Sequence, residues 1–265
     1  MKVITLLENT SNRADLTAEH GLSLYIETET HKILFDAGQS DAFAKNAAAL
    51  GVDLTQVDFA VLSHGHYDHG GGLLTFLQIN DHAPVYLSRH AFGPHYNASE
   101  RYIGLSPELL KSDRLRFVDG DTQICDGIRL YTAGTMPLPW PVNPFGLKRK
   151  EHGCFINEDF RHEIYMTVRA ADKTVLFSGC SHRGILNIAS RFRPDICFGG
   201  FHFSKLSCTG TEGQMLENAG KSLLSFPTVF YTGHCTGSEQ YAFLKEIMKD
   251  RLHSITCGSQ IVIEP

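Results

Sequence analysis

The sequence predicts an α/β (α+β) protein in which β-sheets lie inside and helices pack outside. Two observations lead to this prediction. In each half of the chain, short apolar runs bounded by turn residues come first, and strands then alternate with helical patterns. The chain has 265 residues, of which 42% are hydrophobic and 20% charged, which is enough to close one large core. We therefore expect a single domain, residues 1–265, made of two similar halves.

In the first half, apolar spacing separates strands from helices. Phe43, Ala47 and Leu50 recur at helical intervals and indicate a helix that ends at Gly51. The run Phe59–Leu62 is unbroken, which is typical of a strand buried on both faces. The other expected elements are strands at Val3–Leu7, Leu22–Glu27, Lys32–Phe35 and Pro84–Leu87 and a helix at Gly71–Ile79.

The second half repeats this organisation. Glu163–Arg169 and Thr174–Phe177 are predicted to form a hairpin, and Ile185, Ile188 and Phe192 share one face of the helix that follows. The remaining expected elements are strand Asp195–Phe198, a helix carrying Met215, Ala219 and Leu223, strand Thr228–Tyr231, a helix carrying Tyr241, Leu244 and Ile247, and strand Ile261–Ile263.

One long segment, residues 134–152, has no clear periodicity. It contains prolines at 137, 139, 141 and 144 and the only tryptophan of the chain, Trp140. A long proline-rich segment inside a compact domain is usually a functional loop or a disordered one. We interpret it as a lid loop over a pocket.

Composition excludes several classes of function. The net charge of -5 provides no basic surface for nucleic acid, and the basic run at Lys148–Lys150 is short. No apolar run approaches the ~20 residues of a membrane span, and the apolar start is too short for a signal peptide. The seven cysteines are scattered and form no Cys-x-x-Cys pair, so a reducing cytoplasm is expected. The sequence does not indicate an oligomeric state.

A histidine-rich cluster directly follows the buried strand at Phe59–Leu62. His64, His66, Asp68 and His69 lie within a few residues and are flanked by glycines. Imidazole and carboxylate are ligands for zinc, manganese or iron. The alternative is a polar turn whose histidines cap a helix, but this density of ligands favours binding of one or two divalent metal ions.

Five ordered motifs extend this pattern along the chain, at Glu19–Ser23, Ser63–His69, Gly179–Ile185, Gly199–His202 and Thr232–Gly237. With the Asp-x-Gly turn at Asp36, they resemble the metallo-β-lactamase superfamily. Within it, they are similar to the branch named for an archaeal dihydropterin–ribofuranosylaminobenzene 5'-phosphate synthase. The resemblance implies an αββα sandwich of two mixed β-sheets, with helices on the outer faces and one or two metal ions at one edge.

The resemblance also implies further ligands at strand ends. His182 would complete the site of a first ion with His64 and His66, and His234 would join Asp68 and His69 at a second. Zinc is the expected metal, with manganese, iron or nickel as alternatives. Asp68 would hold the attacking hydroxide and His234 would steady the developing charge.

Two ligands common in the superfamily have no counterpart in this sequence. The middle region offers no histidine after the strand Arg129–Ala133, and Cys180 or Ser181 stands near the place of a bridging aspartate. The occupancy of the second site and the identity of a bridging ligand therefore remain open.

Five other residues are candidates for substrate contact or metal binding. His202 is predicted to contact substrate or support the ligands, with a histidine bonded to backbone in the core as the alternative. Arg183 could clamp a phosphate or be a solvated surface charge. Trp140 could stack on a flat ring or belong to the core. Cys180, like Cys235, is interpreted as a small buried hydrophobe, with a thiolate ligand as the alternative.

These observations predict a metal-dependent enzyme, a hydrolase or transferase, that acts on a small phosphorylated or anionic substrate, which could be pterin-like. Either hydrolysis or synthesis with displacement of diphosphate is compatible with the ligands. The alternative is a non-catalytic metal-binding or ligand-sensing protein of the same fold, motivated by the missing ligands. Nucleic-acid processing is disfavoured by the acidic balance.

Overall fold

The computed structural model describes residues 1–264, and its core is a sandwich of two seven-stranded sheets. The first sheet has the order β17-β1-β2-β3-β4-β5-β7. Its strands are β1 (Lys2–Leu7), β2 (Ser23–Glu27), β3 (Lys32–Phe35), β4 (Phe59–Val61), β5 (Val85–Ser88), β7 (Leu115–Val118) and β17 (Gln260–Val262). The last strand pairs with the first, so both ends of the chain belong to this sheet.

The second sheet has the order β16-β15-β14-β13-β12-β9-β8. Its strands are β8 (Thr122–Cys125), β9 (Ile128–Thr132), β12 (Ile164–Ala170), β13 (Lys173–Phe177), β14 (Ile196–Phe198), β15 (Val229–Thr232) and β16 (Leu252–Ser254). Each sheet passes from antiparallel to parallel pairing at an inner strand, at β3 in the first and at β13 in the second. This repeated pattern matches the expectation of two similar halves.

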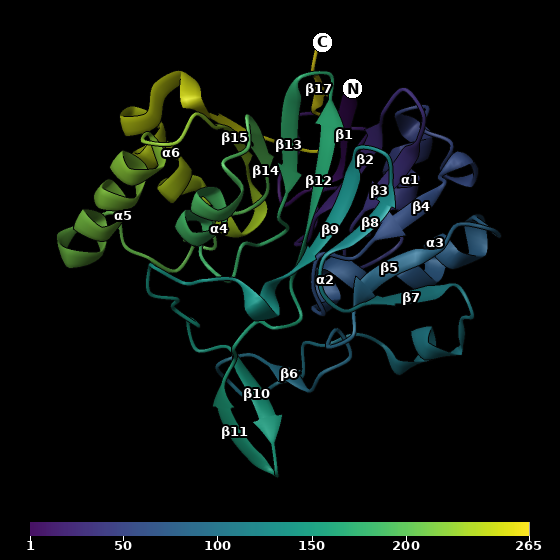
Figure 1. The fold of residues 1–265 in the computed structure, drawn as a ribbon, viewed down its shortest axis with the longest axis horizontal. Coiled ribbons are helices and arrows are strands. Elements are labelled where there is room, and N and C mark those ends of the chain that lie inside the picture. Colours follow the sequence, from purple (N-terminus) through teal and green to yellow (C-terminus); the bar gives the residue numbers. More distant parts are fainter. Residues whose placement is uncertain (265) are drawn as a thin grey trace.

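Three apolar layers hold the molecule together. Between the sheets, Phe35 of the first packs against Phe177 of the second, with ring centroids 5.7 Å apart. On the outer face of the first sheet lie α1 (Ala42–Ala49), α2 (Tyr67–Gly70) and α3 (Leu73–Ile79). On the outer face of the second lie α4 (Ile185–Phe192), α5 (Gly210–Leu223) and α6 (Ser238–Met248). Figure 1 shows the helices on opposite sides of the sheets, which confirms the predicted αββα sandwich.

The predicted lid segment contains more secondary structure than expected. It begins with a 3₁₀ turn at Ala133–Thr135 and includes β10 (Lys148–Glu151), which pairs with β11 (Cys154–Asn157) and with β6 (His95–Tyr96). This small sheet projects from the lower edge of the sandwich in Figure 1. The expectation of an irregular loop therefore holds for only part of 134–152.

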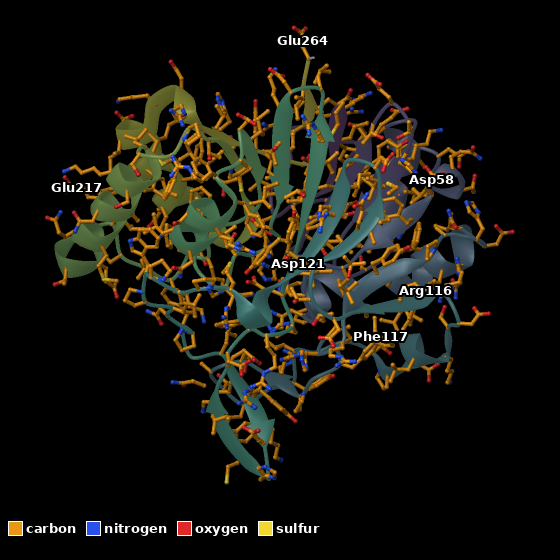
Figure 2. All side chains as sticks on the ribbon, in the orientation of Figure 1. Asp58, Arg116, Phe117, Asp121, Glu217 and Glu264 are labelled. Atoms are coloured by element: carbon orange, nitrogen blue, oxygen red, sulfur yellow. The ribbon has the colours of Figure 1, made fainter. Side chains whose placement is uncertain are left out.

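The sequence patterns also missed β7, an edge strand beside β5. Its Arg116 and Phe117, labelled in Figure 2, are largely exposed, so the strand lacks the alternation of a half-buried one. Among the described residues, no helix has the length and apolar character needed to cross a membrane.

Candidate metal centre

The turns that follow five strands meet at one edge of the sandwich. The strands are β3 and β4 of the first sheet and β13, β14 and β15 of the second, and within each sheet these strands run parallel to one another. The backbone N–H of Ile164 donates to the carbonyl of Ser63 over 2.8 Å and joins the two sheets at this edge. The turn after β13 can approach the turn after β4 this closely because residue 179 is a glycine. A Cβ at Gly179 would lie 2.3 Å from the Ser63 hydroxyl.

All six predicted metal ligands come together at this edge and are buried. His64 Nε2 lies 3.3 Å from His182 Nε2, and potential ligand atoms of these two residues and His66 all lie within 4.8 Å of one another. His69 Nε2 lies 3.2 Å from His234 Nε2, which is itself 3.3 Å from Asp68 Oδ2. The described residues therefore form two adjoining groups of potential ligands.

The hydrogen bonds behind the imidazole rings determine which ring nitrogen faces the centre. His69 Nδ1 lies 2.6 Å from Asp36 Oδ2 and donates to this carboxylate. His234 Nδ1 donates to Asn9 Oδ1 over 2.8 Å, and this oxygen also accepts from the Gly21 N–H. Each Nδ1 therefore carries the proton, which leaves a lone pair on each Nε2.

His64 follows the same arrangement. The Ser63 hydroxyl donates to Asp36 Oδ2 over 2.7 Å, so its oxygen accepts from His64 Nδ1 over 2.9 Å. The lone pair of His64 Nε2 therefore also faces the centre. Where neither ring carries a proton on Nε2, the lone pairs of His69 Nε2 and His234 Nε2 face each other at 3.2 Å and repel, and a cation between them removes the repulsion. The residues present thus fit a divalent metal ion.

The charges around the centre favour a cation as well. Burial and the neighbouring imidazoles hold the pKa of His64, His66 and His182 well below the usual value, so these rings are neutral, the form that can bind a metal ion. Burial opposes ionisation of Asp68, but the nearby histidines outweigh it and hold the pKa of this carboxyl well below its usual range. Burial also lowers the pKa of His69, yet the neighbouring carboxylates raise it overall, which shows that positive charge is stabilised there.

Cys180 stands between the two groups of potential ligands. Its Sγ lies 3.1 Å from His69 Nε2 and within 4.8 Å of ligand atoms of His64 and His69 on one side and of His234 and Cys235 on the other. Burial raises the pKa of the Cys180 thiol well above its usual value, so without a metal it remains protonated. Its position is that of a potential shared ligand.

Two elements of the centre were not predicted from the sequence. The buried Glu163 side chain accepts from the backbone N–H groups of His182 and Arg183 over 2.6 and 3.0 Å and from the Tyr165 hydroxyl over 2.8 Å. Burial raises the pKa of Glu163 to about 7. This carboxyl fixes the turn that presents His182, although nothing in the sequence marks a glutamate at the start of a strand for that role.

The other unpredicted element is a buried pair of histidines behind His66. His95 Nδ1 donates to Glu158 Oε2 over 2.7 Å, and His162 Nδ1 accepts from the Gly65 N–H over 2.9 Å. The proton of His162 is therefore on Nε2, which makes this atom a donor and not a metal ligand. Through its bond to the Gly65 N–H, His162 of this pair fixes the backbone next to His66.

Arg183 does not have the position expected of a phosphate clamp. Its guanidinium donates to the carbonyl of Asp159 over 2.7 Å and to that of Met136 over 3.4 Å, and it does not line either of the two cavities at the centre. It is largely buried, so the alternative of a solvated surface charge is wrong as well. Its contacts instead tie the proline-rich segment to the start of α4.

Two adjoining cavities open at the centre. The metal-side cavity, about 870 Å³, is lined by His66, Asp68, His182 and His234 and by residues from the opposite loops. The apolar cavity, about 370 Å³, lies under Trp140 and its neighbours. His182 and His202 line both cavities. Trp140, Pro141, Asn143 and Phe145 of the proline-rich segment line the apolar cavity, and His202 stands where the two spaces meet.

Comparison with known proteins agrees with this architecture. Residues 16–145 match the family model of the metallo-β-lactamase superfamily. The structure of Tm1679, a metal-dependent hydrolase of the β-lactamase superfamily, superimposes with a TM-score of 0.85 and 29% sequence identity over the full length of both chains. In family model, fold and sequence, the chain is similar to the metallo-β-lactamase superfamily.

Two curated relatives in Methanocaldococcus jannaschii cover nearly the whole chain. One is 7,8-dihydropterin-6-methyl-4-(β-D-ribofuranosyl)-aminobenzene-5'-phosphate synthase, 26% identical over 96% of this chain and 95% of its own. The other is the uncharacterized protein MJ0448, 29% identical over 91% of this chain and 93% of its own. The first supports the branch of the superfamily that the five motifs indicated.

Proposed function

We propose that this protein is a metal-dependent enzyme that acts on a small phosphorylated or anionic substrate, either as a hydrolase or as a synthase that displaces diphosphate. The observation that carries the proposal is that two pairs of imidazole Nε2 atoms meet beside the metal-side cavity, His64 with His182 and His69 with His234. Such an arrangement holds metal ions and leaves room beside them for a reactant.

The ligands divide into two sets in this proposal. His64, His66 and His182 hold a first ion, and Asp68, His69 and His234 hold a second, with Cys180 available to both. Imidazole, carboxylate and thiolate together suit zinc. When bound, such ions supply Lewis-acid polarisation of substrate oxygens and a hydroxide near neutral pH.

The side chains at the mouth of the centre orient the reactants. Asp68 Oδ2 lies 3.2 Å from His20 Nε2, and both residues line the metal-side cavity. The ionised Asp68 accepts a hydrogen bond from the attacking water or amine and sets its direction, while the exposed ring of His20 donates to a departing oxygen. Lys205 is the one lysine or arginine among the described residues that line this cavity, and it provides a positive charge for an anionic substrate group.

Two relatives support the two forms of the proposal. The name of Tm1679 supports hydrolysis, and the name of the M. jannaschii synthase supports a phosphorylated, pterin-containing substrate. The same ligand set serves both, since each reaction needs a stabilised negative charge on oxygen at the centre.

The test begins with metal analysis of purified protein, followed by assays with phosphodiester, lactone and thioester substrates. We expect bound zinc or a related ion, and turnover that both a chelator and His64→Ala abolish. The matched control, His82→Ala, removes an exposed histidine away from the centre and should leave both unchanged. Protein without metal would refute the proposal. Bound metal with no turnover on any substrate class would favour the ligand-sensing alternative.

A further inference from the structure

Apart from His182, the walls of the apolar cavity are made by residues other than the predicted metal ligands. The cavity lies between α4, α5, the turn after β14 and the proline-rich segment. Its apolar lining includes Trp140, Phe145, Phe203, Leu206, Leu216 and Ala219. Its volume of about 370 Å³ is in the range of small-molecule sites.

The side-chain oxygens of the three asparagines in these walls, Asn143, Asn187 and Asn218, already accept hydrogen bonds within the protein. The Asn187 side chain accepts from the Trp140 N–H and donates to the Trp140 carbonyl, each over 2.9 Å, and also donates to the carbonyl of Arg183. Asn143 Oδ1 accepts from the Phe145 N–H over 2.8 Å. The cavity therefore offers its ligand mainly apolar and aromatic surface, which favours an apolar ring over a polar chain.

The connection with the metal centre determines what kind of molecule fits. His182 and His202 line both cavities, and their ring centroids are 4.2 Å apart. His202 Nδ1 is buried and has no hydrogen-bond partner in the described structure. A ligand with a polar group at this junction would satisfy that atom while its two ends occupy different cavities.

We propose that the apolar cavity binds a planar aromatic group of the substrate, whose anionic reacting group lies at the metal centre. This inference rests on the proposed function, because it assumes that the reaction occurs at that centre. The aromatic side chains of Trp140 and Phe145 provide faces for the ring, and His202 contacts the group that links the ring to the reacting end.

The chain carries its own reporter for this cavity. Trp140 is the only tryptophan and lines the apolar cavity, so its fluorescence reports occupancy there. The probes are phenylphosphonate and methylphosphonate, which carry the same anion with and without an aromatic ring. Calorimetry on zinc-loaded protein gives their affinities, and fluorescence shows whether the ring reaches the cavity.

We expect phenylphosphonate to bind roughly tenfold or more tightly than methylphosphonate, because the ring buries additional apolar area. It alone should change the Trp140 emission. Ser222→Phe and Ala219→Leu, which fill the cavity from α5, should reduce the affinities of the two probes to the same value. The matched control Gln214→Leu adds similar bulk at an exposed position of α5 outside the cavity and should preserve the difference.

The outcomes separate this inference from the proposed function. Equal affinities for the two probes, with unchanged Trp140 emission, overturn the aromatic site but leave the metal centre intact. Binding of either probe that is indifferent to removal of zinc contradicts the proposed function. If one cavity-filling variant fails to fold, the other variant and the wild-type comparison of the two probes still decide the question.

Discussion

Asp36 provides the sharpest test of the metal centre, although it is not among the predicted ligands. It is buried and accepts three hydrogen bonds, from the Ser63 N–H and hydroxyl over 2.7 Å each and from His69 Nδ1 over 2.6 Å. Asp36→Asn retains the shape but replaces one acceptor oxygen by an NH₂ group. If the remaining oxygen still accepts from the Ser63 N–H, the new NH₂ group faces His69 Nδ1. Because the NH₂ group is a donor there, the proton of His69 must move from Nδ1 to Nε2.

The magnitude follows from these contacts. The lone pair that His69 directs into the centre becomes an N–H, so we expect the affinity for the second ion to fall by about 10–100-fold. Two bonds to an ionised acceptor, each worth about 1.5–3 kcal/mol, become weaker neutral ones, which costs about 2–3 kcal/mol of the free energy of unfolding. For a chain of this size, such a loss lowers the melting temperature by roughly 5–10 °C.

The assay is a zinc titration against a chromophoric chelator, together with calorimetric melting of the metal-free protein. Asp53→Asn is the matched control, because Asp53 also accepts from a backbone N–H and a hydroxyl, both of Thr55, but lies on the surface. Its zinc affinity should equal that of the wild type. An Asp36→Asn protein that binds two zinc ions as tightly as the wild type would refute the assignment of the imidazole tautomers.

Three further predictions concern the centre and its cover. Removal of metal by a chelator should lower the melting temperature by several degrees, since saturation at ~100 Kd stabilises the folded state by about 2.7 kcal/mol per site; a melting curve unaffected by chelation and zinc would contradict this. In cobalt-substituted protein, Cys180→Ser should abolish a sulfur-to-cobalt charge-transfer band that Cys235→Ser retains, and a band that survives in Cys180→Ser would exclude Cys180 as a ligand. Asn187→Ala removes both side-chain bonds to Trp140 and should accelerate amide hydrogen exchange in the segment around Trp140, with little change in the global melting temperature. The control variant Asn218→Ala changes another residue of the same cavity and should leave the exchange rates unchanged. Equal exchange rates in the two variants would show that Asn187 does not hold the segment.

The layers of the fold could be predicted because local apolar patterns coincide with its inner strands. Phe59–Leu62 and residues 175–177 of the second hairpin strand are buried on both faces, and their unbroken apolar sequences show it. The patterns failed where strands are short or exposed. β6 has two residues and pairs with β10, from a proline-rich segment, so neither strand carries a period that sequence analysis could detect.

The same reasoning explains which parts of the centre were predictable. His64, His66, Asp68 and His69 form a local cluster, and their spacing alone indicates metal binding. Glu163 reaches the centre only because β12 joins the turn after β4 through the Ile164-to-Ser63 bond, and His95 and Glu158 meet only through the small sheet. Such contacts depend on pairings far apart in the chain, for which the sequence has no local signal.

Cys180 shows why burial alone could not decide between two interpretations. A buried cysteine is usually a small hydrophobe, and both Cys180 and Cys235 satisfy that description. The neighbours separate them: Cys180 Sγ faces the lone pair of His69 Nε2 at 3.1 Å, whereas Cys235 Sγ donates to a backbone carbonyl over 3.5 Å. Cys180 can approach His69 because the preceding residue, Gly179, packs closely against the Ser63 hydroxyl. This hydroxyl donates to Asp36. The two halves of the sandwich thus meet through the residues that orient the ligands, so an ion bound between His69 and Cys180 would connect the halves as well as serve the reaction.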